Sequence, residues 1–424
     1  MTLTDRHGLH LTGASRKAVD LWDEAVAAYN RYAGDPVGLL DAAIADSPGF
    51  LMAHVLKGYM HVLGSNPRAV KVAGRCLQAA AGIEGHGLEA MHRAALAALL
   101  EQPADIARAS LLLEDVSLAQ PHDIIALQIG QTLDFLRGDS RMLRDRIARA
   151  LPLWKPDMPG YHAIQGMIAF GLEETGSYAR AEAAGRLALE LEPRNGWARH
   201  AVAHVMEMQD RREEGVAFMR TDPDDWSEGS FFAVHNWWHT ALFHLGLGDT
   251  DGALAAYDGP IFGERSDLAF DMVDAAGLLW RMHLMKADVG DRWSELADLY
   301  LKQPHGQYAF DDAHAMMAFA ATDRRDAAAD LLAALEEAAS GQGDHALIAR
   351  EVGLPVARGI EAFGLGDYRR CSELLRPARN GAARFGGSHA QRDVIDLTLI
   401  EAADRAGDRD LSIALAAERA IARG

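Results

Sequence analysis

The chain has 424 residues, of which 49% are hydrophobic and 7% aromatic, so it carries ample material for a folded core. Its 42 Lys and Arg residues against 61 Asp and Glu residues give a formal net charge of −19, which opposes binding to nucleic acid and to anionic membrane surfaces. Cys76 and Cys371 stand in unrelated sequence contexts, and the sequence has neither a signal-peptide pattern nor an apolar run long enough to span a bilayer. We therefore expect a soluble, cytoplasmic protein that binds neither nucleic acid nor membrane.

Residues 1–150 are expected to form the less regular part of a helical array. The segments 50–82, 89–119 and 123–150 each combine two helix-forming stretches around a short polar break, which is the pattern of a helical hairpin.

Residues 151–424 contain recognisable repeats. In the clearest of them, 166–198, Gly176, Tyr178, Ala188 and Pro193 stand at the spacing of a tetratricopeptide repeat, in which small residues let two antiparallel helices approach and the proline ends the second helix. Weaker copies join an apolar helix to an alanine-rich helix through a Gly-Asp or Thr-Asp turn, at 239–258, 316–335, 355–376 and 396–423. We therefore predict one continuous all-α domain, 1–424: an α-α superhelix, or solenoid, of tetratricopeptide-like hairpins that curls around a central inner site.

Two segments interrupt the predicted array beside the histidine-bearing helices. Residues 220–230 and 258–267 are polar and contain Pro or Gly-Pro, which predicts loops. Because long structureless insertions are uncommon in compact domains, we interpret both as functional lids.

Two histidine pairs recur in phase along the repeats. His200 and His204 form one pair and His235 and His239 the other, and each pair has the i, i+4 spacing that places both imidazoles on one helix face. His204 and His239 are 35 residues apart, about one repeat, and a further 35 residues lead to Asp274. Such pairs suit zinc, manganese or iron, so the four histidines are predicted to bind a divalent metal on the inner wall.

Other polar residues in the same phase are expected to serve the site. Glu207 and Asp274 would orient the histidines or activate water, and His314 would complete the ring as an acid or base. The residues expected to contact a substrate are His162, Trp197, Trp238, Asp271, Asp311, His389 and Arg392.

Simpler explanations of these residues stay open. Buried histidines also hydrogen-bond to neighbouring carboxylates in purely structural roles, and tryptophans fill the gaps between repeats. Neutral histidines and aspartates would also bind an organic ligand without a metal. The sequence lacks a phosphate-binding loop, a dinucleotide-binding glycine fingerprint and a nucleophile elbow, so those enzyme classes are not supported.

Five sequence strings resemble the tetratricopeptide repeat protein 38 family. They lie at 161–178, 197–215, 235–242, 271–281 and 310–317, and the resemblance extends from about residue 15 to 400. It implies a soluble array of tetratricopeptide-like repeats and implies no particular reaction.

The leading functional hypothesis is a pocket lined by histidine and aspartate that binds a small molecule, with a divalent metal, for hydrolysis or a related acid/base reaction. The alternative is a non-catalytic scaffold whose groove binds a peptide or protein. A protein partner or a homodimer is compatible with either hypothesis, and the sequence leaves open whether the protein is an enzyme.

Overall fold

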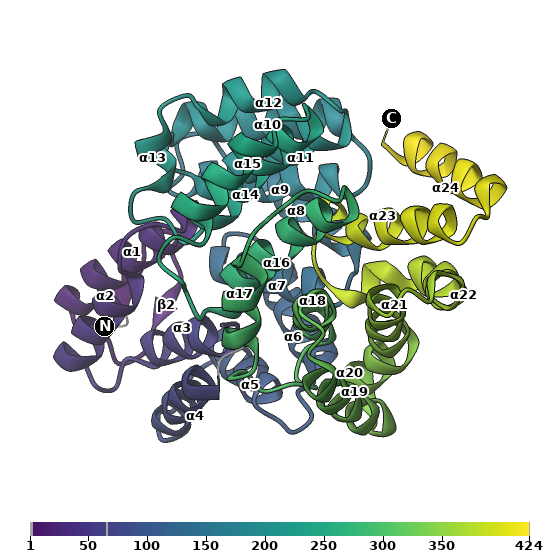
Figure 1. Ribbon diagram of the computed structural model, residues 1–424. Coiled ribbons are helices and arrows are strands. Elements are labelled where there is room, and N and C mark those ends of the chain that lie inside the picture. The colour runs from purple at the N-terminus through teal and green to yellow at the C-terminus, as the bar shows by residue number, and fades with distance from the viewer. Residues whose placement is uncertain (1–2, 65–66, 424) are drawn as a thin grey trace. The chain divides into compact units, whose positions relative to one another are not determined.

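The computed structural model describes residues 3–64 and 67–423 and is almost entirely helical, which confirms the predicted all-α fold (Figure 1). Near the N-terminus, strands β1 (Leu3–Thr4) and β2 (His10–Leu11) form a short antiparallel pair with Leu3 opposite Leu11. The chain divides into two compact units. Unit 1 comprises Met1–Phe135, Asp139–Val202 and Asp222–Ala233, and unit 2 comprises Leu136–Gly138, Ala203–Thr221 and Val234–Gly424. The expectation of one continuous domain stays a prediction.

Unit 1 consists of helices joined by short connections, and the hairpins predicted at 50–82, 89–119 and 123–150 correspond to α3–α4, α5–α6 and α7–α8. Within it, α1 packs on α2, α3 on α4, α5 on α6 and α9 on α10. The elements are α1 (Arg16–Arg31), α2 (Pro36–Asp46), α3 (Leu51–Val62), α4 (Pro67–Ala81), α5 (Leu88–Leu99), α6 (Ile106–Ala119), α7 (Ile124–Leu136), α8 (Ser140–Ala150), η1 (Leu151–Leu153), α9 (Tyr161–Glu173), α10 (Tyr178–Leu191), the first half of α11 (Gly196–Met208) and α13 (Pro223–Ser227).

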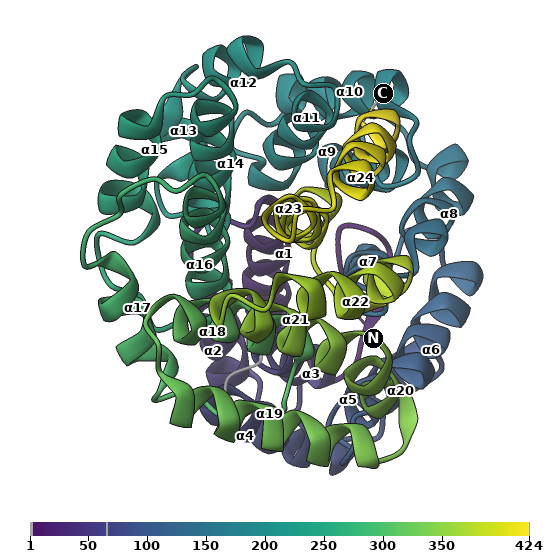
Figure 2. The ribbon, with the colours of Figure 1, turned by 45° about the vertical axis from the view of Figure 1, so that its right-hand side comes forward.

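Unit 2 is built in the same way, with α16 packed against both α18 and α23. Helices α18 and α19, α21 and α22, and α23 and α24 form hairpins (Figure 2). The elements are the second half of α11, α12 (Arg212–Met219), α14 (Ala233–Gly246), α15 (Thr250–Ala256), the π-helical turn η2 (Tyr257–Ile261), α16 (Ala269–Leu284), α17 (Arg292–Tyr300), α18 (Ala309–Ala321), α19 (Arg325–Ser340), α20 (Gly343–Ile348), η3 (Ala349–Gly353), α21 (Leu354–Gly364), α22 (Tyr368–Ala378), η4 (Arg379–Phe385), α23 (His389–Arg405) and α24 (Arg409–Ala422).

The Gly-Asp turns predicted between hairpin helices have a common geometry. Before α15, α22 and α24, the glycine has a φ of 76°, 77° and 80°, a left-handed conformation that glycine adopts at little steric cost. The aspartate that follows each glycine accepts a hydrogen bond from a backbone N–H in the first turn of the next helix. The dipeptide therefore reverses the chain and also caps the second helix of the hairpin.

Small residues bring neighbouring helices into close contact, as the repeat pattern predicts. A Cβ atom placed on Gly185 of α10 would lie 2.5 Å from Val202 Cγ2 of α11 and 3.6 Å from Ala169 Cβ of α9. Glycine is therefore required where these three helices meet.

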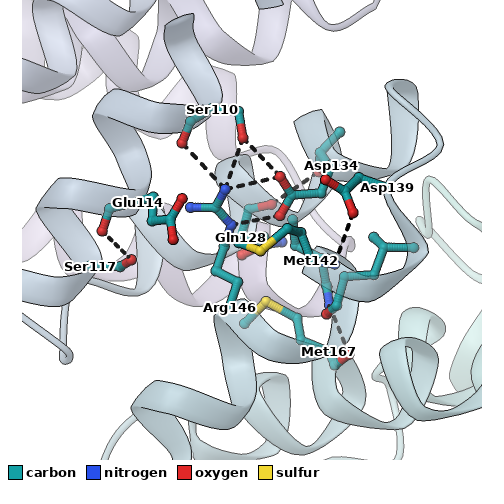
Figure 3. A network of polar contacts seen from close by, with 12 residues as sticks. Ser110, Glu114, Ser117, Gln128, Asp134, Asp139, Met142, Arg146 and Met167 are labelled. Atoms are coloured by element: carbon teal, nitrogen blue, oxygen red, sulfur yellow. Dashed lines mark hydrogen bonds and ion pairs between the residues drawn. The ribbon is translucent and has the colours of Figure 1, made fainter. Parts of the chain in front are cut away.

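A buried ion pair connects three helices of unit 1 (Figure 3). Arg146 of α8 donates through Nε to Asp134 of α7 at 2.7 Å and through Nη2 to Ser110 Oγ of α6 at 2.9 Å. Burial raises the pKa of Asp134, and the guanidinium of Arg146 opposes that rise. These hydrogen bonds join α6, α7 and α8 through buried polar side chains.

Both segments predicted as loops contain ordered elements instead. Pro223–Ser227 forms the short helix α13, and its Trp226 is fully buried. Tyr257–Ile261 forms the π-helical turn η2, followed by the buried Phe262. Apart from the buried Trp226, Ile261 and Phe262, most residues of the two segments are exposed, and their interpretation as lids stays a prediction.

No helix in residues 3–64 or 67–423 combines the length and the apolar character needed to cross a bilayer.

Candidate metal centre

Three of the four histidines predicted as metal ligands come together in unit 2. His204 projects from α11, and His235 and His239 project from consecutive turns of α14. The ring centroid of His239 lies 4.5 Å from that of His204 and 5.0 Å from that of His235. One ring nitrogen of each histidine lies within 4.8 Å of a ring nitrogen of the other two. The exposed fractions are 0% for His204, 3% for His235 and 0% for His239. We call these three residues the histidine trio.

An aspartate fixes the orientation of one member of the trio. Both carboxylate oxygens of Asp274, on α16, lie within hydrogen-bond distance of His235 Nδ1, at 3.0 and 2.8 Å. Gln391 of α23 donates through Nε2 to the same carboxylate at 3.3 Å. When Nδ1 of His235 is protonated and donates a hydrogen bond to Asp274, Nε2 keeps a free lone pair. This arrangement is common among metal-binding histidines.

The surroundings of His239 favour its neutral imidazole form. Burial lowers the pKa of His239 well below its ordinary value, and the neighbouring His204, His235 and Arg281 lower it further. Trp238 stacks on His235 with 13° between the ring planes, and the guanidinium of Arg281 lies 5.3 Å from the centroid of the Trp238 ring. Neutral imidazole is the form of histidine that binds metals.

His200, the fourth predicted ligand, lies in unit 1 among aromatic rings, and its role as a metal ligand stays a prediction. Its ring stacks on Phe170 at a centroid distance of 5.4 Å and lies 4.9 Å from Trp197 and 5.6 Å from Phe232. Trp197, predicted to contact a substrate, is thus part of an aromatic cluster in unit 1. His162 also belongs to unit 1, where its Nδ1 lies 3.0 Å from Asn195 Nδ2 and burial lowers its pKa to about 4.

Of the three predicted catalytic residues, Asp274 is hydrogen-bonded to His235 of the trio. Glu207 instead accepts a hydrogen bond from Arg423 at 2.6 Å, so its carboxylate serves an ion pair with the C-terminal end of α24. His314 donates through Nδ1 to the carbonyl of Phe310 at 2.8 Å, and burial lowers its pKa to about 4. Its ring packs against α16 at Gly277, one turn beyond Asp274.

The predicted substrate-contacting residues of unit 2 fall into two groups. Burial raises the pKa of Asp271, and the negative charge of Asp274 raises it further. Burial and the charge of Asp312 raise the pKa of Asp311 to about 7. His389 is the first residue of α23, and Arg392, one turn later, donates to the carbonyl of Gly387.

Sequence reasoning missed two tyrosines that lie near each other, and one of them, Tyr300, lies near these carboxylates. Tyr257 and Tyr300 are 1% and 3% exposed, and neither hydroxyl has a hydrogen-bond partner among the described residues. Burial raises the pKa of Tyr300, and the negative charges of Asp311 and Asp274 raise it further, which places its hydroxyl in their vicinity. Tyr257 lies just before the Gly-Pro dipeptide in the segment 258–267. This dipeptide is the one sequence feature that could have drawn attention to Tyr257.

Comparisons with known proteins add little to this description. No family model matches the chain. Among solved structures, yeast Tom70 aligns with 95% of this chain and 91% of its own, at 15% sequence identity and a TM-score of 0.35. A structure of Naa15/Naa10 bound to HypK-THB aligns with 96% of this chain and 63% of that chain, at 11% identity and a TM-score of 0.27. The fold class therefore rests on the helical hairpins of the chain itself.

Proposed function

We propose that unit 2 binds one divalent metal ion through the histidine trio and uses it to hydrolyse a small molecule. The observation that carries the proposal is the convergence of three buried imidazoles, from two helices, beside an aspartate that orients one of them. Isolated buried histidines need no such arrangement, because each is satisfied by one carboxylate or carbonyl.

The trio suits zinc best among zinc, manganese and iron. Tetrahedral zinc with bonds of about 2.0–2.1 Å to nitrogen brings its ligand atoms to roughly 3.4 Å from one another. The ring nitrogens of the trio already lie within 4.8 Å, so small side-chain rotations would suffice. With the trio as its protein ligands, a tetrahedral zinc ion would keep its fourth position for water or substrate, as in catalytic zinc sites.

The chain's own groups would supply the acid/base chemistry, since Asp274 and Asp311 both lie near Tyr300. A bound zinc ion would supply a water molecule with a lowered pKa. Asp274 would hold His235 in its metal-binding orientation through the Nδ1 hydrogen bond. Asp311, with a pKa of about 7, would accept or return a proton near neutral pH.

Metal analysis of the purified protein tests the first part of the proposal. We expect close to one zinc ion per chain, lost in His204→Ala and retained in His86→Ala, which changes an exposed histidine outside the site. Because His204 is buried, circular dichroism must show that the variant folds; Asp274→Asn, which keeps all three ligands, is expected to weaken zinc binding about 10- to 100-fold. A protein that neither carries zinc, manganese or iron nor binds added zinc would refute the site.

Turnover of chromogenic esters tests the second part. We expect hydrolysis of 4-nitrophenyl acetate or 4-nitrophenyl phosphate that a chelator abolishes, that zinc restores and that Asp311→Asn reduces about 10²-fold or more. Zinc binding without any turnover would favour the scaffold candidate described next.

The full burial of His204 and His239 favours a second candidate, a scaffold in which the trio holds helices together around a structural metal. Such a protein would bind a peptide or protein partner through its helical repeats. Chelation would then lower the melting temperature and partner binding together, and no ester would be hydrolysed.

Membership of the tetratricopeptide repeat protein 38 family and a cytoplasmic location are further parts of this proposal. They are supported by the five sequence strings and by the acidic, cysteine-poor composition. Fractionation of cells that produce the tagged chain would test the location, and recovery in a membrane or secreted fraction would contradict it.

A further inference from the structure

Unit 1 contains an open cavity of about 330 Å³ that is separate from the histidine trio. It lies beside the C-terminal end of α1 and the start of α2, and its charged lining residues are Arg6, Glu24, Arg31, Asp35 and Arg194. Since one water molecule occupies about 30 Å³ in the liquid, the cavity has room for a ligand of about ten non-hydrogen atoms.

Two of the five charged groups are already engaged. Arg6 is 3.4 Å from Asp23, to which its backbone N–H also donates, so its charge is matched locally. Asp35 accepts a hydrogen bond from Gly38 N at 2.8 Å and thereby caps α2. Neither group needs a ligand to complete its contacts.

Two guanidinium groups remain available to a ligand. Arg31 Nη1 is 3.8 Å from Glu192, beyond hydrogen-bond distance, and its Nε is buried with no hydrogen-bond partner among the described residues. Arg194 is exposed, and its side chain makes no ion pair or hydrogen bond within the part of the chain that the structure describes. A carboxylate accepts paired hydrogen bonds from guanidinium groups, so these two arginines form the anionic end of a site.

The rest of the lining defines what else the ligand carries. Glu24 is exposed and likewise makes no ion pair within residues 3–64 and 67–423, so one negative charge faces the same cavity. The remaining wall includes Ala28, Ala33 and Leu39, which offer apolar contact. The cavity thus combines two cations, one anion and an apolar surface.

We propose that this cavity binds a free aliphatic amino acid. The α-carboxylate would lie between Arg31 and Arg194, the α-ammonium would pair with Glu24, and the side chain would contact Ala28 and Leu39. Leucine has nine non-hydrogen atoms, which agrees with the room for about ten derived from the volume of a water molecule. The site is in unit 1, so it stands or falls independently of the metal centre.

Titration calorimetry with three matched probes tests the proposal. L-leucine carries both charges, 4-methylpentanoate lacks the ammonium group, and isoamylamine lacks the carboxylate. We expect saturable binding of leucine that is at least about tenfold tighter than that of either analogue, a difference of about 1.4 kcal/mol. Equal affinity for leucine and 4-methylpentanoate would show that the site does not recognise the ammonium group. The absence of saturable leucine binding would refute the proposed site.

Variants of the charged lining residues, of which Arg194 and Glu24 are exposed and Arg31 is half-buried, identify the contacts. Arg194→Gln and Arg31→Gln are expected to weaken leucine binding at least about tenfold. Glu24→Gln should reduce leucine to the affinity of 4-methylpentanoate and leave 4-methylpentanoate unchanged. Arg180→Gln, which removes an exposed arginine of α10 in the same unit, is the matched control and should bind leucine as the unmodified protein does. If all four variants bind leucine equally, the cavity is not the binding site.

Discussion

Asp311 illustrates how surroundings set the chemistry of one side chain. Its pKa is raised to about 7 by burial and by the charge of Asp312. Because its folded-state pKa lies above its unfolded value, ionisation of Asp311 destabilises the folded state. This penalty is absent below the unfolded pKa, grows as the pH rises and is complete above about 7.

We therefore predict that Asp311→Asn stabilises the protein more at about pH 8 than at about pH 5. The change in the free energy of unfolding should differ between the two pH values by at least about 1.4 kcal/mol, the equivalent of one pKa unit. Urea denaturation at both pH values measures this difference, with Asp330→Asn, on the exposed face of α19, as the control. An equal effect of Asp311→Asn at both pH values would contradict the raised pKa.

Gly130 provides a prediction about packing in unit 1. A Cβ atom at this position of α7 would lie 2.7 Å from the guanidinium of Arg146, which Asp134 and Ser110 hold in place. We expect Gly130→Ala to lower the free energy of unfolding by about 1–3 kcal/mol. Gly74→Ala is the matched control, because a Cβ there has no atom within 4 Å, and it should raise stability by up to about 1 kcal/mol. Urea denaturation measures the free energy of unfolding of both variants. A higher free energy of unfolding in Gly130→Ala would show that Arg146 is free to move.

At the residue scale, the sequence predicted the site residues that recur at the spacing of one repeat, about 35 residues. His204, His239 and Asp274 follow the repeat, so their approach could be expected from spacing alone. Tyr300 follows no such spacing, and only the fold brings it near Asp311. Glu207 lies on the predicted helix face, but Arg423 binds it from 216 residues away, a contact that no local pattern encodes.

At the scale of elements, α24 shows what holds the last hairpin. Arg423 bonds to Glu207 of α11 at 2.6 Å and to Asp393 of α23 at 3.0 Å, and Asp393 also pairs with Arg419. Leu415 is the one residue of this helix classed as buried, so apolar packing anchors α24 weakly. The ion-pair network therefore carries much of the attachment of α24 to its neighbours.

We predict that Arg423→Met loosens α24 selectively. Removing the shared cation leaves Glu207 and Asp393 partly uncompensated, at a cost of about 1–3 kcal/mol. Hydrogen exchange should become faster in the amides of α24, while the amides of α16 keep their protection. Arg409→Gln, at the exposed start of the same helix, should leave the exchange of α24 unchanged. Equal acceleration throughout unit 2 would mean that the network supports the whole unit rather than this helix.

At the scale of the whole molecule, the hairpin pattern sufficed to predict an all-α fold. The division into two units was not predictable, because the boundary between Val202 and Ala203 falls inside α11, which has no glycine or proline after its first residue. The predicted loops at 220–230 and 258–267 failed for a related reason. Trp226 and Phe262 are buried, and this burial outweighs the local preference for a loop.

Zinc binding by the trio predicts a change in the stability of the folded chain. A ligand that binds only the folded state at 100 times its Kd adds about 2.7 kcal/mol to the free energy of unfolding. We therefore expect zinc to raise the urea midpoint of the unmodified protein, and a chelator to reverse the effect. His239→Ala should abolish the zinc dependence even where the variant is itself less stable, because the comparison is made with and without zinc in each protein. His86 is exposed and lies outside the trio, so His86→Ala is the control and must retain the full effect. If His239→Ala responds to zinc as strongly as the unmodified protein, the stabilising ion binds elsewhere, and the trio is a structural cluster without a metal.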